Sequence, residues 1–263
     1  MPELPEVESV RQALLPYINQ VIEHVTIHDT WLRETVPSDL SEKLVKKKLL
    51  DIQRISKYLV WHIEDAPALL LHLGMSGRIE GRYQLEKHDK VSWTFFNTSL
   101  PPLYFNDARR FGLIVWADSY QLPKLGPEPL TDAFTPQYLA HALAIKRTPI
   151  KVALLDQAII AGLGNIYVCE ALYHARISPL RPANTLSTAE YRALYQAINK
   201  VIDRAITLSG STWRDYRKPD GESGLFQNEF MVYDREGELT EHGLVVRIKQ
   251  AGRSTYYCPY HQT

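Results

Sequence analysis

Residues 117–136 read ADSYQLPKLGPEPLTDAFTP, and this stretch decides how the chain is organised. It carries four prolines and little periodicity, which is typical of a linker. Strand-like sequence precedes it and helical sequence follows it. The chain of 263 residues is therefore expected to form domains of different secondary structure on the two sides of this linker.

The segment before the linker has the pattern of a β-sandwich with one leading helix. A helix is expected over 5–18, where Pro5 suits the first helical position and Val7, Val10 and Leu14 share one face. Strand-like runs broken by Gly, Pro, Asn and Asp then follow at 21–28, 50–63, 68–73, 91–97 and 113–116.

The segment after the linker carries helix start signals. Thr135-Pro136 and Thr148-Pro149 each offer an N-cap followed by proline at the first helical position. Ser187 and Glu190 form a capping-box pattern ahead of a long apolar-periodic run. From about residue 224 the chain returns to strand pairs, which predicts a helical bundle followed by a small hairpin.

Composition is that of an ordinary globular protein, with 45% hydrophobic and 23% charged residues. Lys+Arg and Asp+Glu are balanced at 30 each, which counts mildly against a nucleic-acid binder. Cys169 and Cys258 are too few for a disulfide framework, and the acidic start lacks the features of a signal peptide. No apolar run reaches the ~20 residues of a membrane span, so we expect a cytosolic enzyme or binding protein.

The first residues, Met1-Pro2-Glu3-Leu4-Pro5-Glu6, offer a catalytic device. Removal of Met1 would leave a secondary amine, and the positive end of the following helix favours the free base over the ammonium ion. Attack of that amine on a sugar C1′ would give an iminium, with Glu3 moving protons. On composition alone, an ordinary helix lead-in explains the same residues and is the better interpretation.

Ordered motifs along nearly the whole chain change that balance. They are MPELPEVE at 1–8, RISKYL around Lys57, LHLGMSGR at 71–78, NDARRFG at 106–112, LGPEPL at 125–130, AGLGNIYVCEAL at 161–172, STWRDY at 211–216 and DGESGLFQ at 220–227. Together they resemble the formamidopyrimidine-DNA glycosylase branch of the formamidopyrimidine-DNA glycosylase/endonuclease VIII family. So many matches in order exclude chance as the explanation.

The resemblance implies an α+β multidomain fold. Its expected parts are an N-terminal catalytic β-sandwich with a leading helix (2–120), a linker (121–135), a helix–two-turn–helix DNA-binding domain (136–223) and a β-hairpin finger (224–263). It also implies a monomeric, cytoplasmic, nucleoid-associated enzyme that needs no cofactor for catalysis. Its partner would be damaged double-stranded DNA, lying in the cleft between the domains.

The implied activity is that of a bifunctional DNA glycosylase/AP lyase which excises 8-oxoguanine and formamidopyrimidines. Pro2 resembles the family nucleophile and Glu3 the general acid/base. Glu6 resembles an acidic residue that supports the site and contacts the extruded nucleotide. Lys57 falls where the family keeps a lysine beside the lesion phosphate, although a solvated strand-edge lysine fits Lys57 taken alone. The alternatives are a non-catalytic damaged-DNA-binding protein and an endonuclease VIII-like enzyme for oxidised pyrimidines.

Three residues resemble the trio that fills the gap left by an extruded base, namely Met75, Arg109 and Phe111. For Met75 and Phe111 the competing interpretation is packing in the core. Solvent exposure of their side chains distinguishes gap filling from core packing. The segment Trp213–Gly224 corresponds to the loop that closes over an oxidised purine. That loop, with the opening ELPEVE, favours purine lesions.

Phosphate contacts are implied for His72, Asn165 and Arg253, together with Lys57. Asn165 follows Gly-Leu-Gly and would open a helix, whose backbone N–H groups can receive a phosphate. Arg253 lies in QAGRSTYYC, a hairpin tip from which an arginine reaches the DNA backbone without base specificity.

The finger departs from the family pattern of two CxxC pairs that hold zinc. His242, Cys258 and His261 could supply three ligands, whereas structural zinc usually takes four Cys or His. Glu238 or Glu241 would be a poor fourth. We therefore favour a zincless hairpin, held by packing of Val245, Ile248, Tyr256 and Tyr257.

Overall fold

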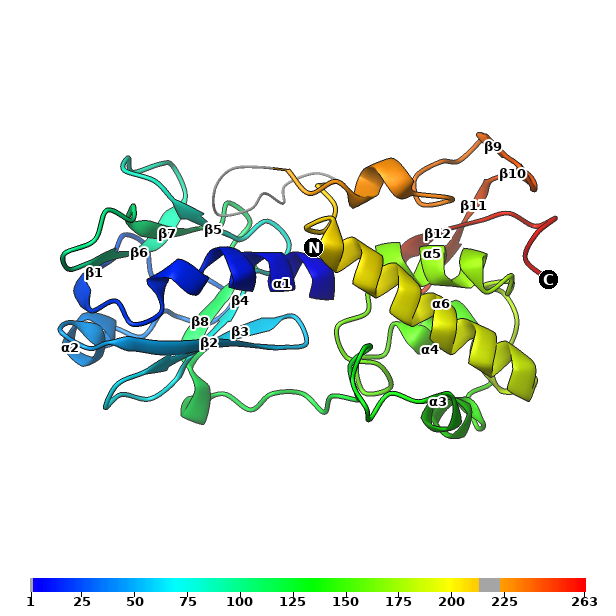
Figure 1. Cartoon of the computed structure of the whole chain (residues 1–263), viewed down its shortest axis with the longest axis horizontal. Helices are drawn as coiled ribbons and strands as arrows, with labels where there is room; N and C mark the ends of the chain where they lie inside the picture. Colours follow the sequence, from blue (N-terminus) through cyan, green and yellow to red (C-terminus); the bar gives the residue numbers. More distant parts are fainter. Residues whose placement is uncertain (1, 213–222) are drawn as a thin grey trace. The chain divides into compact units, whose positions relative to one another are not determined.

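Two units make up the computed structural model of the protein, which describes residues 2–212 and 223–263 (Figure 1). Unit 1 comprises Met1–Leu122 and Leu208–Gln227, and unit 2 comprises Pro123–Thr207 and Asn228–Thr263. Each unit is therefore assembled from two separate parts of the sequence. The four-part division expected from the sequence follows chain order and stays a prediction.

Unit 1 starts with a helix and continues as short strands. Its helical elements are α1 (Leu4–Ala13), η1 (Leu15–Tyr17), α2 (Leu40–Leu44) and η2 (Ala117–Ser119). Its strands are β1 (Ile22–Ile27), β2 (Leu49–Ile55), β3 (Tyr58–Ile63), β4 (Leu69–His72), β5 (Arg78–Gly81), β6 (Asp89–Phe95), β7 (Leu103–Asn106) and β8 (Leu113–Trp116).

The strands of unit 1 form two four-stranded sheets that share one core. The sheet orders are β1-β6-β7-β5 and β2-β3-β4-β8, and all neighbours are antiparallel. Trp61 of β3 and Trp93 of β6 are fully buried, with ring centroids 5.0 Å apart, so the two sheets meet face to face. Helix α1 packs against β2 and β3 and adds Val7 and Val10 to the same core. The predicted β-sandwich with a leading helix is confirmed.

Unit 2 is helical and ends in short strands. Its elements are α3 (Pro136–Leu143), α4 (Ile150–Leu154), α5 (Asn165–His174), η3 (Ala183–Thr185), α6 (Thr188–Thr207), β9 (Leu239–Thr240), β10 (Gly243–Leu244), β11 (Val246–Gln250) and β12 (Arg253–Tyr257), while η4 (Phe226–Glu229) crosses the unit boundary. Helix α6 packs on α3 and α5, and β12 packs on α5. The predicted helical domain with a terminal hairpin is confirmed.

Local sequence signals predicted two helix starts correctly, but they were wrong for the end of the first helix and for the cap at Thr148. Thr135 caps α3 by accepting the Tyr138 N–H at 3.0 Å, and Glu190 Oε2 accepts the Ser187 N–H at 2.7 Å, as predicted. The first helix, expected over 5–18, instead stops at Ala13, because Pro16 removes an N–H and its ring opposes a continued helix. The expected cap at Thr148 is also wrong by one residue, since the extended Pro149 precedes Ile150.

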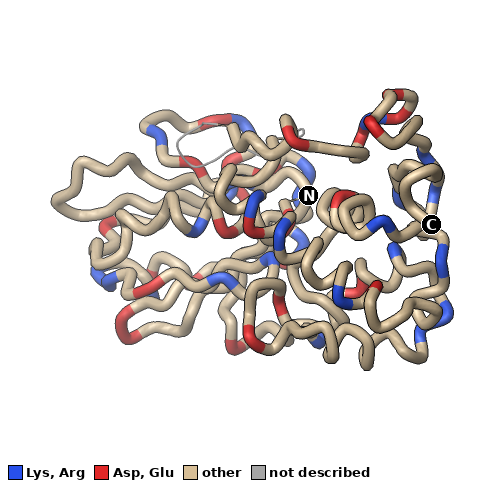
Figure 2. The backbone as a smooth tube through the Cα atoms, turned by 45° about the vertical axis from the view of Figure 1, so that its right-hand side comes forward, with Lys and Arg blue, Asp and Glu red and all other residues tan. Residues whose placement is uncertain are grey.

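Charged residues of both signs are interspersed over unit 1, in keeping with the net charge of zero (Figure 2). Any site for an anionic partner must therefore be built by local arrangement. Among the helices in the described ranges, none is both long and apolar enough to cross a membrane.

Candidate active site and DNA-contact residues

The start of α1 buries the predicted catalytic residues. Pro2 is buried, and Glu3 and Glu6 are only 3% and 2% exposed. Glu3 caps α1, and Glu6 Oε2 accepts the backbone N–H of Glu3 at 2.8 Å, as in a capping box. The start of the helix therefore fixes the backbone directly after Pro2.

The second oxygen of Glu6 binds a distant part of unit 1. Glu6 Oε1 accepts the Ser211 N–H at 2.7 Å and the Ser211 hydroxyl at 3.2 Å. A Cβ at Gly210, whose φ is +76°, would lie 2.8 Å from the same oxygen, so glycine is required there. Both carboxylate oxygens of Glu6 are thus engaged by the protein, and the contact of Glu6 with an extruded nucleotide stays a prediction.

The chain on either side of residues 213–222 is tied together in unit 1. Thr212 Oγ1 accepts the Gly224 N–H at 2.7 Å, and Gln227 Oε1 accepts the Thr212 N–H at 2.9 Å. Gln227 Nε2 in turn donates to the Gly224 carbonyl at 2.7 Å. The predicted lesion-covering loop Trp213–Gly224 lies, up to residue 222, outside the described residues, but its base is fixed next to the partner of Glu6.

Lys57 lies in the tight turn between β2 and β3 and is 6% exposed. Arg54 Nη1 donates to the carbonyl of Ser56 at 3.0 Å, and Ser56 has a left-handed φ of 57°. Arg54 Nε also donates to Glu8 Oε2 on α1 at 3.1 Å. Arg54 therefore connects the helix that follows Pro2 with the turn that carries Lys57.

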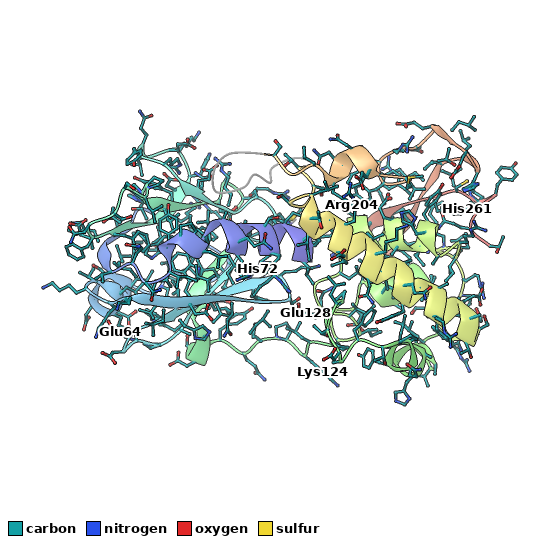
Figure 3. The ribbon with its side chains drawn as sticks, viewed as in Figure 1. Glu64, His72, Lys124, Glu128, Arg204 and His261 are labelled. Carbon is teal, nitrogen blue, oxygen red and sulfur yellow. The ribbon has the colours of Figure 1, made fainter. Side chains whose placement is uncertain are left out.

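His72, labelled in Figure 3, ends β4 and pairs in register with Tyr58, the residue after Lys57. Its Nδ1 accepts the Gly74 N–H at 2.9 Å, so in the neutral ring the proton is on Nε2. Burial, with the nearby charges of Arg33 and Lys57, lowers the pKa of His72 to about 3. His72 is therefore an uncharged N–H donor at neutral pH.

We expect His72 to make unfolding pH-dependent. Its folded pKa of about 3 lies below the usual value of 6.5, so between these values only the unfolded chain binds the extra proton. The free energy of unfolding should thus fall as pH drops below 6.5, by up to about 1.4 kcal/mol per pH unit from this group. Urea unfolding of the wild type and His72→Gln between pH 7.5 and 4 measures the difference. Parallel curves for the two proteins would contradict the assignment.

The predicted filling residues lie on two adjoining loops of unit 1. Met75 and Phe111 are 40% and 46% exposed, and Arg109 is also exposed, so core packing is excluded for them. The Arg109 guanidinium lies 5.2 Å from the centroid of the Phe111 ring. A Cβ at Gly74, with φ +63°, would lie 2.4 Å from the Phe111 carbonyl carbon, so the loops are in direct contact.

A fully buried carboxylate holds these two loops together. Asp107 Oδ1 accepts the Ser76 hydroxyl at 2.7 Å and the Arg109 N–H at 3.2 Å. Asp107 Oδ2 accepts the Gly112 N–H at 2.7 Å. The Asp107 side chain thereby fixes the backbone of both exposed loops, so Met75 and Phe111 project from a rigid base.

In unit 2 the structure brings Asn165 close to the hairpin of Arg253. Asn165 opens α5, and its Nδ2 donates to the carbonyl of Ser254 at 3.0 Å. The exposed Arg253 is the first residue of β12, after the left-handed turn at Ala251 and Gly252. The helix N-terminus and the arginine form a small surface suited to a phosphate, although phosphate binding by either residue stays a prediction.

The finger places three potential metal ligands in a geometry that does not suit zinc. The ring of His261, labelled in Figure 3, is parallel within 6° to the ring of His242, with centroids 3.9 Å apart. Lone pairs of parallel rings do not converge on one ion, and Cys258 Sγ donates to the His242 carbonyl at 3.5 Å. Within the described part of the chain, no group of three or more His, Cys, Asp or Glu could hold a metal ion.

Comparison with known proteins identifies the family. The formamidopyrimidine-DNA glycosylase N-terminal domain matches residues 1–114, and the formamidopyrimidine-DNA glycosylase H2TH domain matches residues 125–217. The chain belongs to the formamidopyrimidine-DNA glycosylase family. The resemblance inferred from the motifs is confirmed.

Similar members of the formamidopyrimidine-DNA glycosylase family match over full length. The formamidopyrimidine-DNA glycosylase of Paracoccus denitrificans (strain Pd 1222) is 46% identical, over 98% of this chain and 99% of its own. The MutM (Fpg) protein of Thermus thermophilus has a TM-score of 0.87 at 38% identity, over 99% of this chain and 98% of its own. Lactococcus lactis Fpg, in complex with DNA containing an abasic site, has a TM-score of 0.89 at 34% identity, over 99% of both chains.

Sequence reasoning missed several residues that organise this member of the formamidopyrimidine-DNA glycosylase family. Ser211, Asp107 and Arg54 were not singled out, although all three lie within the family motifs. Each acts through a partner far along the chain or in another element, which local pattern does not reveal. The motif NDARRFG, with an aspartate two residues before the arginine pair, was the available signal for Asp107.

Proposed function

We propose that this protein is a bifunctional DNA glycosylase/AP lyase of base excision repair, which excises oxidised purines with the Pro2 amine as nucleophile. The observation that carries the proposal is the buried start of α1, where Glu6 holds the backbone of Glu3 directly after Pro2. Membership of the formamidopyrimidine-DNA glycosylase family supports both activities. The wild-type Lactococcus lactis Fpg bound to DNA containing N7-benzyl-Fapy-dG supports the purine lesion class.

Base excision would begin once Met1 has been removed. The Pro2 nitrogen lone pair attacks C1′ of the extruded nucleoside, and the bond from C1′ to the base breaks, with its electron pair leaving on the base. Glu3 donates a proton to the sugar ring oxygen as the ring opens. The Pro2 nitrogen loses its N–H proton, and the released base takes up one proton, so the product is an iminium between Pro2 and C1′ together with the neutral base.

Strand cleavage would follow from the same iminium. Loss of a proton from C2′ expels the 3′ phosphate, and a second elimination expels the 5′ phosphate. The Lys57 cation offsets negative charge on the phosphate beside the lesion, and His72 donates a neutral hydrogen bond from Nε2. Asn165 and Arg253 would hold the DNA backbone from unit 2.

The gap left by the extruded nucleotide would be filled from unit 1. Met75 and Phe111 are exposed apolar side chains on loops fixed by Asp107, as insertion between base pairs requires. Arg109 can hydrogen-bond the base left without its partner.

Borohydride trapping over a lesion panel tests the proposal. Wild-type protein lacking Met1 should form a covalent adduct on an 8-oxoguanine:C duplex and release the base. Absence of any adduct, with DNA still bound, would establish the non-catalytic binding alternative. Lactococcus lactis Fpg is also known in complex with oxidised-pyrimidine DNA, so thymine glycol belongs in the panel. Faster excision of thymine glycol would favour the endonuclease VIII-like alternative.

For the finger, we propose a hairpin that folds without zinc. Val245, Tyr256 and Cys258 pack with Cys169 and Tyr173 of α5 in one buried cluster. The buried Glu170 adds three hydrogen bonds from the backbone N–H groups of residues 231–233, at 2.8, 3.0 and 2.8 Å. These contacts supply the stability that zinc supplies elsewhere.

Metal removal should therefore leave the protein unchanged. We expect the midpoint of thermal unfolding to be the same before and after treatment with a strong chelator, because side-chain packing and the Glu170 hydrogen bonds hold the finger. Elemental analysis of the purified protein provides the direct measurement. One tightly held zinc per chain, with a lower unfolding temperature after its removal, would overturn the zincless finger.

A further inference from the structure

An exposed tryptophan stands beside the loop that carries Arg109 and Phe111. Trp31 is 69% exposed, whereas Trp61, Trp93 and Trp116, the other tryptophans within the described ranges, are at most 6% exposed. The guanidinium carbon of Arg110 lies 5.2 Å from the centroid of the Trp31 ring. Such a stack fixes the arginine over one face of the ring and leaves much of the ring open to a partner.

The loop that presents Trp31 is held in place. The backbone N–H of Trp31 donates to Asp29 Oδ1 at 2.9 Å, and Trp31 forms an isolated β-bridge with Thr35. The Arg33 N–H donates to the Gly112 carbonyl at 3.1 Å, which ties this loop to the end of the Phe111 loop. Trp31 is therefore presented on an ordered surface continuous with the predicted filling residues.

The charges around Trp31 favour an anionic partner. One carboxylate, Asp29, serves two cations, since it pairs with the buried Lys90 and lies 3.7 Å from Arg110. Arg110 is 47% exposed, so it can take a second anionic partner. The exposed Arg109 lies on the same loop, one residue before Arg110. The Trp31 loop adds the exposed Arg33 and Glu34, so four cationic side chains face two carboxylates in this region of a protein whose net charge is zero.

We propose that Trp31 and Arg110 form an additional DNA contact that extends the filling loop along the duplex. Arg110 binds a backbone phosphate, and the Trp31 ring packs on the adjoining deoxyribose while holding Arg110 in place. The pair fits DNA because the flat apolar face of Trp31 can pack on a sugar and the Arg110 guanidinium can bind a phosphate. The pair also adjoins the loop of Arg109 and Phe111, for which we propose contact with DNA. This inference rests on the proposed function.

Binding of Trp31→Ala, Trp31→Phe and Arg110→Ala to a duplex with an uncleavable abasic analogue tests the proposal. We expect Trp31→Ala to weaken binding roughly five- to tenfold, and Trp31→Phe to retain most of the affinity. Arg110→Ala should also reduce the slope of log affinity against log salt by about 1, as loss of one phosphate contact does. Tyr83→Ala, at a site 75% exposed on the same unit, is the matched control and should bind as wild type.

Two outcomes separate this inference from the proposed function. If wild type binds and excises lesions but Trp31→Ala binds equally well, the additional contact is wrong and the enzyme assignment stands. If wild type neither binds the duplex nor forms a trapped adduct, both fail. Since Trp31 is exposed, thermal unfolding of its variants should match wild type, and affinity losses then report on the DNA contact.

Discussion

A Pro2→Gly variant is expected to form the trapped covalent adduct about 100-fold more slowly than wild type. Glycine keeps an amine, but it loses the ring that holds the nitrogen against the start of α1, and misplacement of a reacting group by about 1 Å costs this much. A short peptide extension before Pro2 should abolish the adduct, because the lone pair of an amide nitrogen is delocalised into the carbonyl group and does not attack carbon. Single-turnover trapping with borohydride measures both effects.

Pro5 provides the matched control for Pro2. It lies three residues further on, is buried in the first turn of α1, and carries no amine that could react. Pro5→Ala should keep the trapping rate within a few-fold, with at most a modest loss of stability. Equal rates for wild type, Pro2→Gly and the extended protein would refute the amine as nucleophile.

Replacement of Glu6 with glutamine should lower both stability and excision rate. The amide offers one acceptor oxygen where the carboxylate offers two, so the N–H of either Glu3 or Ser211 loses its partner in a buried site. Such a loss costs about 1–3 kcal/mol of unfolding free energy. When the Glu3 N–H is the group that loses its acceptor, the backbone directly after Pro2 is no longer fixed, and we then expect a ~100-fold lower single-turnover excision rate.

Ser211→Ala is the matched control for Glu6. It removes only the longer hydroxyl contact of 3.2 Å and leaves the backbone N–H bond of 2.7 Å in place. Its stability should fall by about 1 kcal/mol or less. A positioning role predicts that Glu6→Gln lowers the rate while DNA affinity stays close to wild type. A Glu6→Gln enzyme that is destabilised but excises normally would restrict Glu6 to a structural role.

Elements with strong local signals were predictable from the sequence. The proline-rich stretch marked the change from strands to helices, and Thr135 and Ser187 marked helix starts because caps are set by neighbouring residues. Strands β5 and β7 were missed, whereas β4 and β8, which are equally short, were found because they lie in continuous apolar runs, ALLL at 68–71 and LIVW at 113–116. The return of Leu208–Gln227 to unit 1 also has no local signal.

The residues of the candidate site also fall into those that the sequence predicted and those that it did not. Family motifs supplied the exposed and reactive side chains, including Met75 and Phe111, which the structure places on the surface. The residues that hold them, Asp107 and Ser211, work through hydrogen bonds across loops or across most of the chain. Those partners become neighbours only after folding, and a single sequence does not pair them.

The hydrogen bond from Ser211 to Glu6 joins the first turn of the protein to a segment made much later on the ribosome. At ~5–20 residues per second, the nascent β-sandwich waits many seconds before that donor emerges. During this interval Glu6 Oε1 has not yet met its Ser211 donors. A truncated chain that ends at the linker lacks Ser211, so it should be less stable than complete unit 1. Its amino terminus should also be cleaved by a protease more readily than that of the full-length protein.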